Sequence, residues 1–233
     1  SLAQIRQSFA DNEDDICAII IEPIQSEGGD NHVRQEFLEQ LRQLCDENEC
    51  FLIYDEIQTG VGLTGKFWCH EHFGENARPD ILAFGKKMQV CGILVGKKVD
   101  EIETNVFNIP SRINSTWGGN LVDMIRSSKY LEIIEEDNLL KNATIVGNYL
   151  QERLRKISES NNKVLNVRGR GLLTAFDFPT NDMRDAFIKK GLEQNVMFLG
   201  CGNNTIRFRP ALIMEEKHID QGLEVMEKIL PSL

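Results

Sequence analysis

Short apolar runs separated by amphipathic stretches organise the first part of the chain. The runs at 17–21 and 51–54 predict two buried strands, and the apolar spacing across 34–48 predicts an amphipathic helix between them. A strand, a helix and a strand in this order form a βαβ unit, whose crossover we expect to be right-handed. Further runs at 80–84 and 92–96 predict a third and a fourth strand. Shorter helical segments are expected at 4–13 and 66–74.

The pattern changes in the second part of the chain. Residues 105–119 predict an irregular loop, and helical spacing follows from Asn120 to about Ser158, with Gly147 as a possible break. The polar stretch 158–163 is the predicted domain boundary. Beyond it we expect short strands at 164–168, 172–178, 195–199 and 205–209, and helices at 181–193 and 216–229. These patterns predict an α/β protein, with a mostly parallel sheet in residues 1–158 and a small α+β domain in residues 159–233.

Composition and charge narrow the class of protein. A formal net charge of -10 over 233 residues argues against a general nucleic-acid binder. No apolar stretch approaches the length of a membrane span, and the first residues lack the apolar core of a signal peptide. The six cysteines are scattered singly without a CxxC pair, which favours reduced core thiols over a disulfide framework. We therefore expect a cytoplasmic protein that contacts neither nucleic acid nor membrane.

Two charged residues follow neighbouring predicted strands. Asp55 comes directly after the run at 51–54, and Lys86 follows the run at 80–84. Open α/β sheets bind ligands at the carboxyl ends of their strands. A carboxylate there can keep a pyridine nitrogen protonated, and an amine can form a Schiff base, which is what pyridoxal phosphate chemistry needs. Simpler interpretations stay open: Asp55 as the cap of a turn, and Lys86 as a solvated lysine whose neighbour Lys87 points in a different direction.

Other polar residues flank these two positions. On the loop that leaves the strand, Gln58 could reach the ring hydroxyl of such a cofactor and Ile57 could pack on the ring face. The segment 115–120, which contains Thr116, precedes a predicted long helix. Its hydroxyls and free amides indicate either an anion site for a phosphate or an ordinary helix N-cap.

A possible substrate-binding pair lies farther apart in the sequence. Glu27 follows the first strand and so lies at the same rim as Asp55, and Arg207 ends the last strand of the small domain. An arginine there could bind a substrate carboxylate through two hydrogen bonds, and Glu27 could pair with it when no second carboxylate is present. Surface salt bridging is the alternative for both residues.

The segment Cys69-His70-Glu71-His72 contains side chains that can bind a metal, but their spacing does not support a metal site. On a helix, residues two apart face different ways, and no further cluster of ligands is visible. The glycines at 60, 62 and 65 likewise do not form the GxGxxG pattern of a dinucleotide site. We predict neither a metal nor a dinucleotide.

Together these motifs resemble the class III (ornithine-type) aminotransferases, which have the type I pyridoxal phosphate fold. The likeness covers the whole chain, and the residues that carry it are Asp55-Glu56-Ile57-Gln58-Thr59-Gly60, Pro79-Asp80-Ile81, Gly85-Lys86 and Arg207-Phe208-Arg209-Pro210.

The resemblance implies roles for several residues. Lys86 would form the Schiff base with pyridoxal 5'-phosphate, Asp55 would pair with the pyridinium, and Gln58 would contact the ring hydroxyl. Thr116 would bind the phosphate of the cofactor held mainly by the neighbouring subunit, so at least a homodimer is implied. Glu27 and Arg207 would act as a switch that responds to the presence of a second substrate carboxylate.

The resemblance also implies a substrate. Segments 84–92 and 110–120 look most like family members that act on L-lysine. The implied reaction moves the terminal amino group of L-lysine to 2-oxoglutarate and yields 2-aminoadipate 6-semialdehyde and glutamate. Activity on 4-aminobutyrate or ornithine remains an alternative. Many members have Arg where this chain has Leu63, so part of the usual charge network is absent, although Leu63 is compatible with the lysine branch.

Length is the main departure from the family. Family members are nearly twice as long, so we expect this chain to be the carboxyl-terminal half of such a protein. The phosphate loop, the aromatic that stacks on the ring and a further substrate arginine would lie upstream. Alone, these residues are expected to hold the cofactor poorly and to leave sheet edges unpaired. A non-catalytic fragment is therefore a further alternative.

Overall fold

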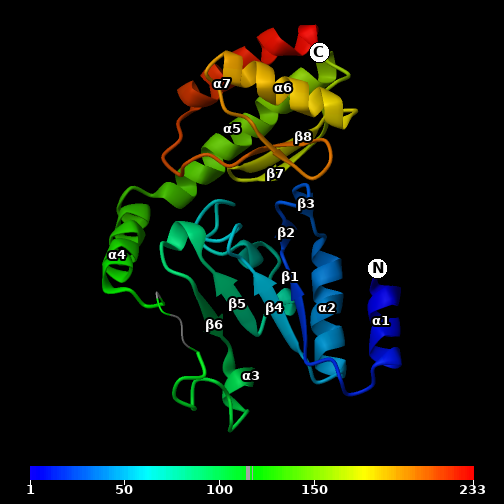
Figure 1. Ribbon diagram of the computed structural model, residues 1–233, viewed down its shortest axis with the longest axis vertical. Helices are drawn as coiled ribbons and strands as arrows, with labels where there is room; N and C mark the ends of the chain where they lie inside the picture. The colour runs from blue at the N-terminus through cyan, green and yellow to red at the C-terminus, as the bar shows by residue number, and fades with distance from the viewer. Residues whose placement is uncertain (114–115, 117) are drawn as a thin grey trace. The chain divides into compact units, whose positions relative to one another are not determined.

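The computed structural model describes residues 1–113, 116 and 118–233. The chain divides into two compact units, each built around its own main sheet (Figure 1). The first unit contains residues 1–23, 33–61 and 68–132, and the second contains residues 24–32, 62–67 and 133–233. Segments that are distant in the sequence therefore belong to one unit.

A four-stranded sheet in the order β1-β4-β5-β6 forms the centre of the first unit. β1 (Ala18–Ile21), β4 (Phe51–Asp55) and β5 (Ile81–Phe84) are parallel, and β6 (Gly92–Val95) pairs antiparallel with β5. Helix α2 (Gln35–Glu47) packs against β1 and β4 (Figure 1) through four buried residues, Leu38, Leu41, Leu44 and Cys45. The register of β4 on β5 sets Asp55 opposite Ala83, so the residues that follow both strands begin at the same edge.

Short helices complete the first unit. They are α1 (Leu2–Asp11), the 3-10 helices η1 (Cys69–His72), η2 (Glu75–Ala77) and η3 (Lys86–Met88), α3 (Lys97–Asp100), and most of α4 (Leu121–Glu136). The helix predicted at 66–74 is thus only the four residues of η1. Its first backbone amides are bonded to the Glu56 carboxylate instead of to helical carbonyls, which holds this segment as a tight turn.

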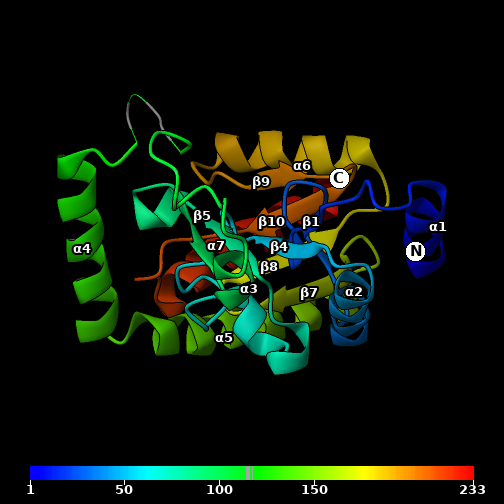
Figure 2. The same ribbon diagram turned by 90° about the horizontal axis from the view of Figure 1, so that it is seen from below.

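An antiparallel sheet in the order β7-β8-β10-β9 forms the second unit. Its strands are β7 (Leu165–Arg170), β8 (Leu173–Asp177), β9 (Leu199–Cys201) and β10 (Thr205–Phe208). Figures 1 and 2 show that one face is covered by α5 (Leu139–Ser160), α6 (Asn181–Glu193) and α7 (Glu216–Ile229), and η4 (Leu230–Ser232) follows. The core between them is an aromatic cluster of Phe176, Phe178, Phe187, Phe198 and Phe208, with neighbouring ring centroids 4.5 to 6.3 Å apart.

A two-stranded hairpin also belongs to the second unit. It pairs β2 (Ile24–Gln25) with β3 (Asn31–His32), and the segment between the two strands carries Glu27. The predicted α/β class, with a mostly parallel sheet followed by a small α+β part, is confirmed.

The predicted long helix is divided, but Gly147 is not the break. The division lies between α4 and α5, where Asn138 has a left-handed φ of 52°. Gly147 lies inside α5, and a Cβ there would meet the backbone of Gly171 at 2.1 Å. Glycine is thus required at this position because the turn between β7 and β8, which contains Gly171, passes directly against the helix.

One strand boundary also differs from the sequence prediction. The strand expected at 195–199 is shifted to β9, because Asn195 has a left-handed φ of 61° just after α6. The elements on either side of residues 158 and 159, α5 and β7, pack together within the second unit. The division into domains 1–158 and 159–233 stays a prediction. Within the described residues, no helix is both long and apolar enough to cross a membrane.

Candidate active site

Lys86 lies in a tight turn immediately after β5. Its φ of 49° is left-handed, a conformation that costs a residue with a side chain about 1–3 kcal/mol and that clusters at functional sites. The turn is the 3-10 helix η3, whose Met88 is buried. The Lys86 Nζ donates a hydrogen bond to Oε1 of Gln58, on the loop that leaves β4. The strained turn therefore aims the amine at the edge where β4 ends.

Lys87 also contacts Gln58, which the sequence did not predict. Its Nζ donates to the backbone carbonyl of Gln58 at 2.8 Å. Successive side chains of a 3-10 helix are about 120° apart, so two neighbouring lysines can reach different atoms of one residue. Lys86 bonds to the side-chain amide of Gln58, and Lys87 bonds to its backbone.

Asp55 is the last residue of β4 and begins the same loop. One carboxylate oxygen accepts a hydrogen bond from the Ile57 backbone amide at 3.1 Å, so Asp55 does cap the turn. No described residue donates a hydrogen bond to its second oxygen. Ile57 lies beside Gly85, where a Cβ would stand 3.6 Å from the Ile57 side chain. The structure thus brings four of the predicted residues to one edge of the sheet: Asp55, Ile57, Gln58 and Lys86.

Glu56 is the residue of this loop that the sequence analysis missed. The residue is 1% exposed, and its carboxylate accepts hydrogen bonds from the backbone amides of Cys69 at 2.5 Å and His70 at 2.8 Å. The imidazole Nδ1 of His70 lies 3.0 Å from Oε1, and the Thr59 hydroxyl is bonded to Oε2. A buried carboxylate with several donors fixes the loop between Asp55 and Gln58 to η1. Its only sequence signal is an acidic residue directly after Asp55.

His70 therefore has a carboxylate partner, Glu56. No group of three or more His, Cys, Asp or Glu side chains in the described part of the chain could hold a metal ion.

The second unit brings together Glu27 and Arg207. Glu27 Oε2 lies 2.8 Å from Nη2 of Arg207; the guanidinium side chain is 5% exposed and the carboxylate side chain 79%. Two further nitrogens of Arg207, Nε and Nη1, are buried and have no hydrogen-bond partner among the described residues. Burial, followed by the positive charge of Arg207, lowers the pKa of Arg209. This region can therefore bind a carboxylate, which would satisfy the buried donors.

Thr116 is exposed in a turn of the first unit. Its neighbours Asn114, Ser115 and Trp117 lie outside the described residues. At the start of α4, the Asn120 side chain accepts a hydrogen bond from the Val122 amide at 2.9 Å, as an ordinary N-cap does. The phosphate-binding role of Thr116 stays a prediction.

Several known proteins are similar to this chain in sequence and in architecture. The family model "Aminotransferase class-III" matches residues 1–230. The L-lysine-epsilon aminotransferase from Mycobacterium tuberculosis is 46% identical to this chain, over 99% of this chain and 51% of its own length. The L-lysine-epsilon aminotransferase from Amycolatopsis lactamdurans is 43% identical, over 100% of this chain and 52% of its own length. A pig mitochondrial 4-aminobutyrate aminotransferase is 37% identical, over 92% of this chain and 42% of its own length.

A solved structure agrees with these sequence matches. The lysine aminotransferase from M. tuberculosis, in its internal aldimine form, superimposes with a TM-score of 0.96 at 46% identity. The match covers 99% of this chain and 53% of that one. The chain therefore spans about half the length of the curated relatives it matches.

Proposed function

The chain belongs to the class III aminotransferase family, and on that premise we propose that the enzyme containing it moves the terminal amino group of L-lysine to 2-oxoglutarate. The products would be 2-aminoadipate 6-semialdehyde and glutamate. One observation carries the proposal: the Lys86 amine meets the Gln58 amide at the edge of the parallel sheet where Asp55 ends β4.

Pyridoxal 5'-phosphate fits the groups at this edge. When bound, it withdraws electrons from the substrate carbon that carries the amino group, so that this carbon loses a proton more easily. Asp55 would hold a positively charged ring nitrogen, Gln58 would meet the ring hydroxyl, and Ile57 would pack on the ring face. The Lys86 amine would attach the aldehyde carbon covalently and would then move a proton between substrate atoms.

Glu27 and Arg207 would handle substrates with one or two carboxylates at the same place. With lysine, the Glu27 carboxylate neutralises Arg207, as in the ion pair described above. With 2-oxoglutarate or glutamate, Glu27 would move aside and Arg207 would bind the second carboxylate. The exposure of Glu27 supports this, because a solvated carboxylate leaves an ion pair at little cost, whereas the buried guanidinium needs a replacement anion.

Lysine is favoured as the amino donor by the relatives. The proteins named L-lysine-epsilon aminotransferases share 42% to 46% of their residues with this chain, and the 4-aminobutyrate aminotransferases share 35% to 37%. Ornithine and 4-aminobutyrate remain the alternative donors.

We also propose a homodimer in which each active site uses residues of both subunits. The start of α4 exposes four large apolar side chains close in sequence to Thr116: Leu121, Val122, Met124 and Ile125. Contiguous exposed apolar surface of this kind marks contacts with other polypeptide. Light scattering of the purified enzyme would measure its mass, and a monomer with full activity would contradict the shared site. The expected cytoplasmic location stays a prediction.

Attachment of the cofactor tests the role of Lys86. The enzyme is loaded with pyridoxal phosphate, reduced with borohydride, digested and analysed by mass spectrometry. We expect the cofactor mass on Lys86, its loss in Lys86→Ala, and its retention in Lys87→Ala, which is the matched control. Labelling of Lys87 in the unmodified enzyme would show that the wrong lysine was chosen. The same treatment of residues 1–233 alone tests the alternative of a non-catalytic fragment.

Substrate choice is tested by the half-reactions. The loaded enzyme is mixed with lysine, ornithine or 4-aminobutyrate, and the change in cofactor absorbance is followed by stopped flow. Lysine should react with the largest kcat/KM. A larger value for ornithine or 4-aminobutyrate would assign the enzyme to that substrate instead.

A further inference from the structure

We propose that Arg168 is a positioning residue for Glu27, and that it thereby sets the balance between lysine and dicarboxylate substrates at Arg207. The inference rests on the proposed function, because it concerns the pair that would distinguish the two substrates. Arg168 itself would touch neither substrate nor cofactor.

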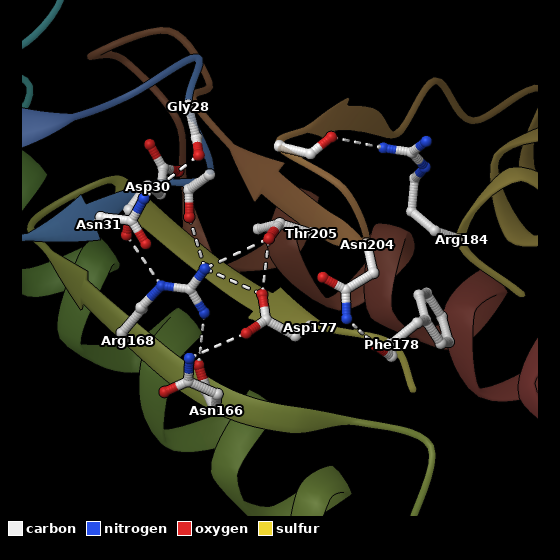
Figure 3. A network of polar contacts seen from close by, with 12 residues as sticks. Gly28, Asp30, Asn31, Asn166, Arg168, Asp177, Phe178, Arg184, Asn204 and Thr205 are labelled. Carbon is white, nitrogen blue, oxygen red and sulfur yellow. Dashed lines mark hydrogen bonds and ion pairs between the residues drawn. The ribbon is translucent and has the colours of Figure 1, made fainter. Parts of the chain in front are cut away.

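Arg168 binds the backbone of the segment that carries Glu27 (Figure 3). From β7, its Nε donates to the carbonyl of Asp30 at 2.8 Å, and its Nη2 donates to the carbonyl of Gly29 at 2.6 Å. Hydrogen bonds from a charged donor are stronger than neutral ones. Two such bonds to consecutive carbonyls fix the path of the chain two and three residues after Glu27.

The guanidinium is itself held in place from the sheet. Nη2 of Arg168 lies 2.9 Å from Asp177 Oδ1, which also accepts a hydrogen bond from the Thr205 hydroxyl at 2.6 Å (Figure 3). Asn166 donates to the other oxygen of Asp177 at 2.8 Å. Burial alone would raise the pKa of Asp177, but the hydrogen bonds from Arg168, Thr205 and Asn166 outweigh it and lower the pKa. The carboxylate stays charged and keeps Arg168 oriented.

The other side of the Glu27 segment rests on the β9–β10 turn. The amide of Gly202 donates to the carbonyl of Glu27 at 3.0 Å. Gly29 has a φ of +122°, and a Cβ on Gly202 would stand 2.8 Å from the Gly29 Cα. The backbone around Glu27 is therefore anchored both to β7, through Arg168, and to the turn before β10, the strand that carries Arg207.

This anchoring matters because the ion pair itself is weak. An exposed carboxylate loses side-chain entropy when it pairs, so a mobile segment would hold it opposite Arg207 for less of the time. Without Arg168, Arg207 would be neutralised less often. The enzyme should then bind 2-oxoglutarate more readily and lysine less readily, which is the same direction of change as removal of the Glu27 carboxylate.

The test compares both half-reactions in enzyme expressed from the complete gene. The variants are Arg168→Gln, Glu27→Ala and their combination, with Arg168→Lys as a milder change in case Arg168→Gln does not fold. Arg153→Gln is the matched control, because Arg153 lies on α5 and pairs with Asp220 of α7, and it contacts neither residues 28–30 nor the β9–β10 turn. For each protein, KM and kcat are measured with lysine and with 2-oxoglutarate.

We expect Arg168→Gln to raise KM for lysine and lower KM for 2-oxoglutarate, each by about two- to fivefold, the range of an exposed ion pair. The double variant should resemble Glu27→Ala, because both changes act through one carboxylate. Hydrogen exchange should quicken at residues 28–31 and stay unchanged in α5. Equal losses in both half-reactions, or effects that add in the double variant, would overturn the inference. Failure of the unmodified enzyme to use lysine would instead refute the proposed function.

Discussion

Replacement of Glu56 by alanine should open the loop that carries Asp55 and Gln58. The carboxylate is buried and receives hydrogen bonds from two backbone amides, at 2.5 and 2.8 Å. The imidazole of His70 contributes a third contact at 3.0 Å. In Glu56→Ala these donors remain in a buried place without their acceptor.

The magnitude follows from the number of donors. A hydrogen bond to a charged group contributes about 1.5–3 kcal/mol, and a buried donor left without an acceptor costs about as much again in lost hydration. Water that enters the space left by the side chain would recover part of this cost. We therefore expect Glu56→Ala to lower the free energy of unfolding of the first unit by about 3–5 kcal/mol. Glu56→Gln keeps one acceptor oxygen and should lower it by about half as much.

Tryptophan fluorescence during urea unfolding measures this change locally. Trp68 directly precedes η1, and its ring lies 6.0 Å from that of Phe84. The samples consist of residues 1–233, in which the second tryptophan, Trp117, is replaced by phenylalanine so that Trp68 is the only tryptophan of the segment. Replacement of Glu71, whose exposed side chain accepts a hydrogen bond from the Trp68 amide, is the control and should shift the free energy by less than about 1 kcal/mol.

The expected order of stability is unmodified protein, Glu71→Ala, Glu56→Gln and Glu56→Ala. A Glu56→Ala protein that unfolds at the same urea concentration as the unmodified protein would refute the reasoning. So would a Glu56→Gln protein that is less stable than Glu56→Ala, because the amide retains an acceptor that alanine lacks.

Three further predictions concern the packing of each unit. Gly147→Ala should lower the free energy of unfolding by about 3 kcal/mol, because the new Cβ would overlap the backbone of Gly171. Gly222→Ala is the control: a Cβ there has no atom within 4 Å and should stabilise α7 by about 0.5–1 kcal/mol. Thermal unfolding measures both variants, and equal effects would contradict the prediction. Burial, with the charges of Arg170 and Arg168, lowers the pKa of His32 to about 4, so the free energy of unfolding should fall by about 2–3 kcal/mol as the pH drops from 6.5 towards 4. His32→Asn should lose most of this pH dependence in urea titrations at pH 7 and pH 4.5. A variant with the same pH dependence as the unmodified protein would refute the prediction. Tyr54→Phe removes a buried hydrogen bond of 2.7 Å to a backbone carbonyl and should cost about 1 kcal/mol in urea unfolding, whereas a stabilised variant would show that this bond does not form.

The strands and the residues at their ends could be predicted from the sequence alone. Apolar runs of strand length bounded by polar residues depend only on neighbours along the chain, and they placed β4, β5 and the residues after them correctly. The antiparallel direction of β6 could not be predicted in this way, because an apolar run carries no information about which way its partner strand runs.

Contacts between distant residues were decided by the tertiary structure. Glycine is a weak helix former, so Gly147 was expected to break the helix. In the structure it lies inside α5, at the point where the helix passes close to the backbone of Gly171. The sequence argued against a metal at His70 but did not identify its partner, the Glu56 carboxylate, which is 14 residues away in the chain. Each depends on the path of the chain between the two residues, which local pattern does not encode.

The sequence by itself determined that a carboxylate and an amine each follow an apolar run of strand length, and the motifs around them carry the resemblance to the family. Only the folded chain decided that the Lys86 amine meets Gln58, and that Arg168 holds a backbone segment 138 residues away. The physical reason is that strand formation responds to the local alternation of apolar and polar residues. A hydrogen bond forms only where the fold brings donor and acceptor within about 3 Å of each other.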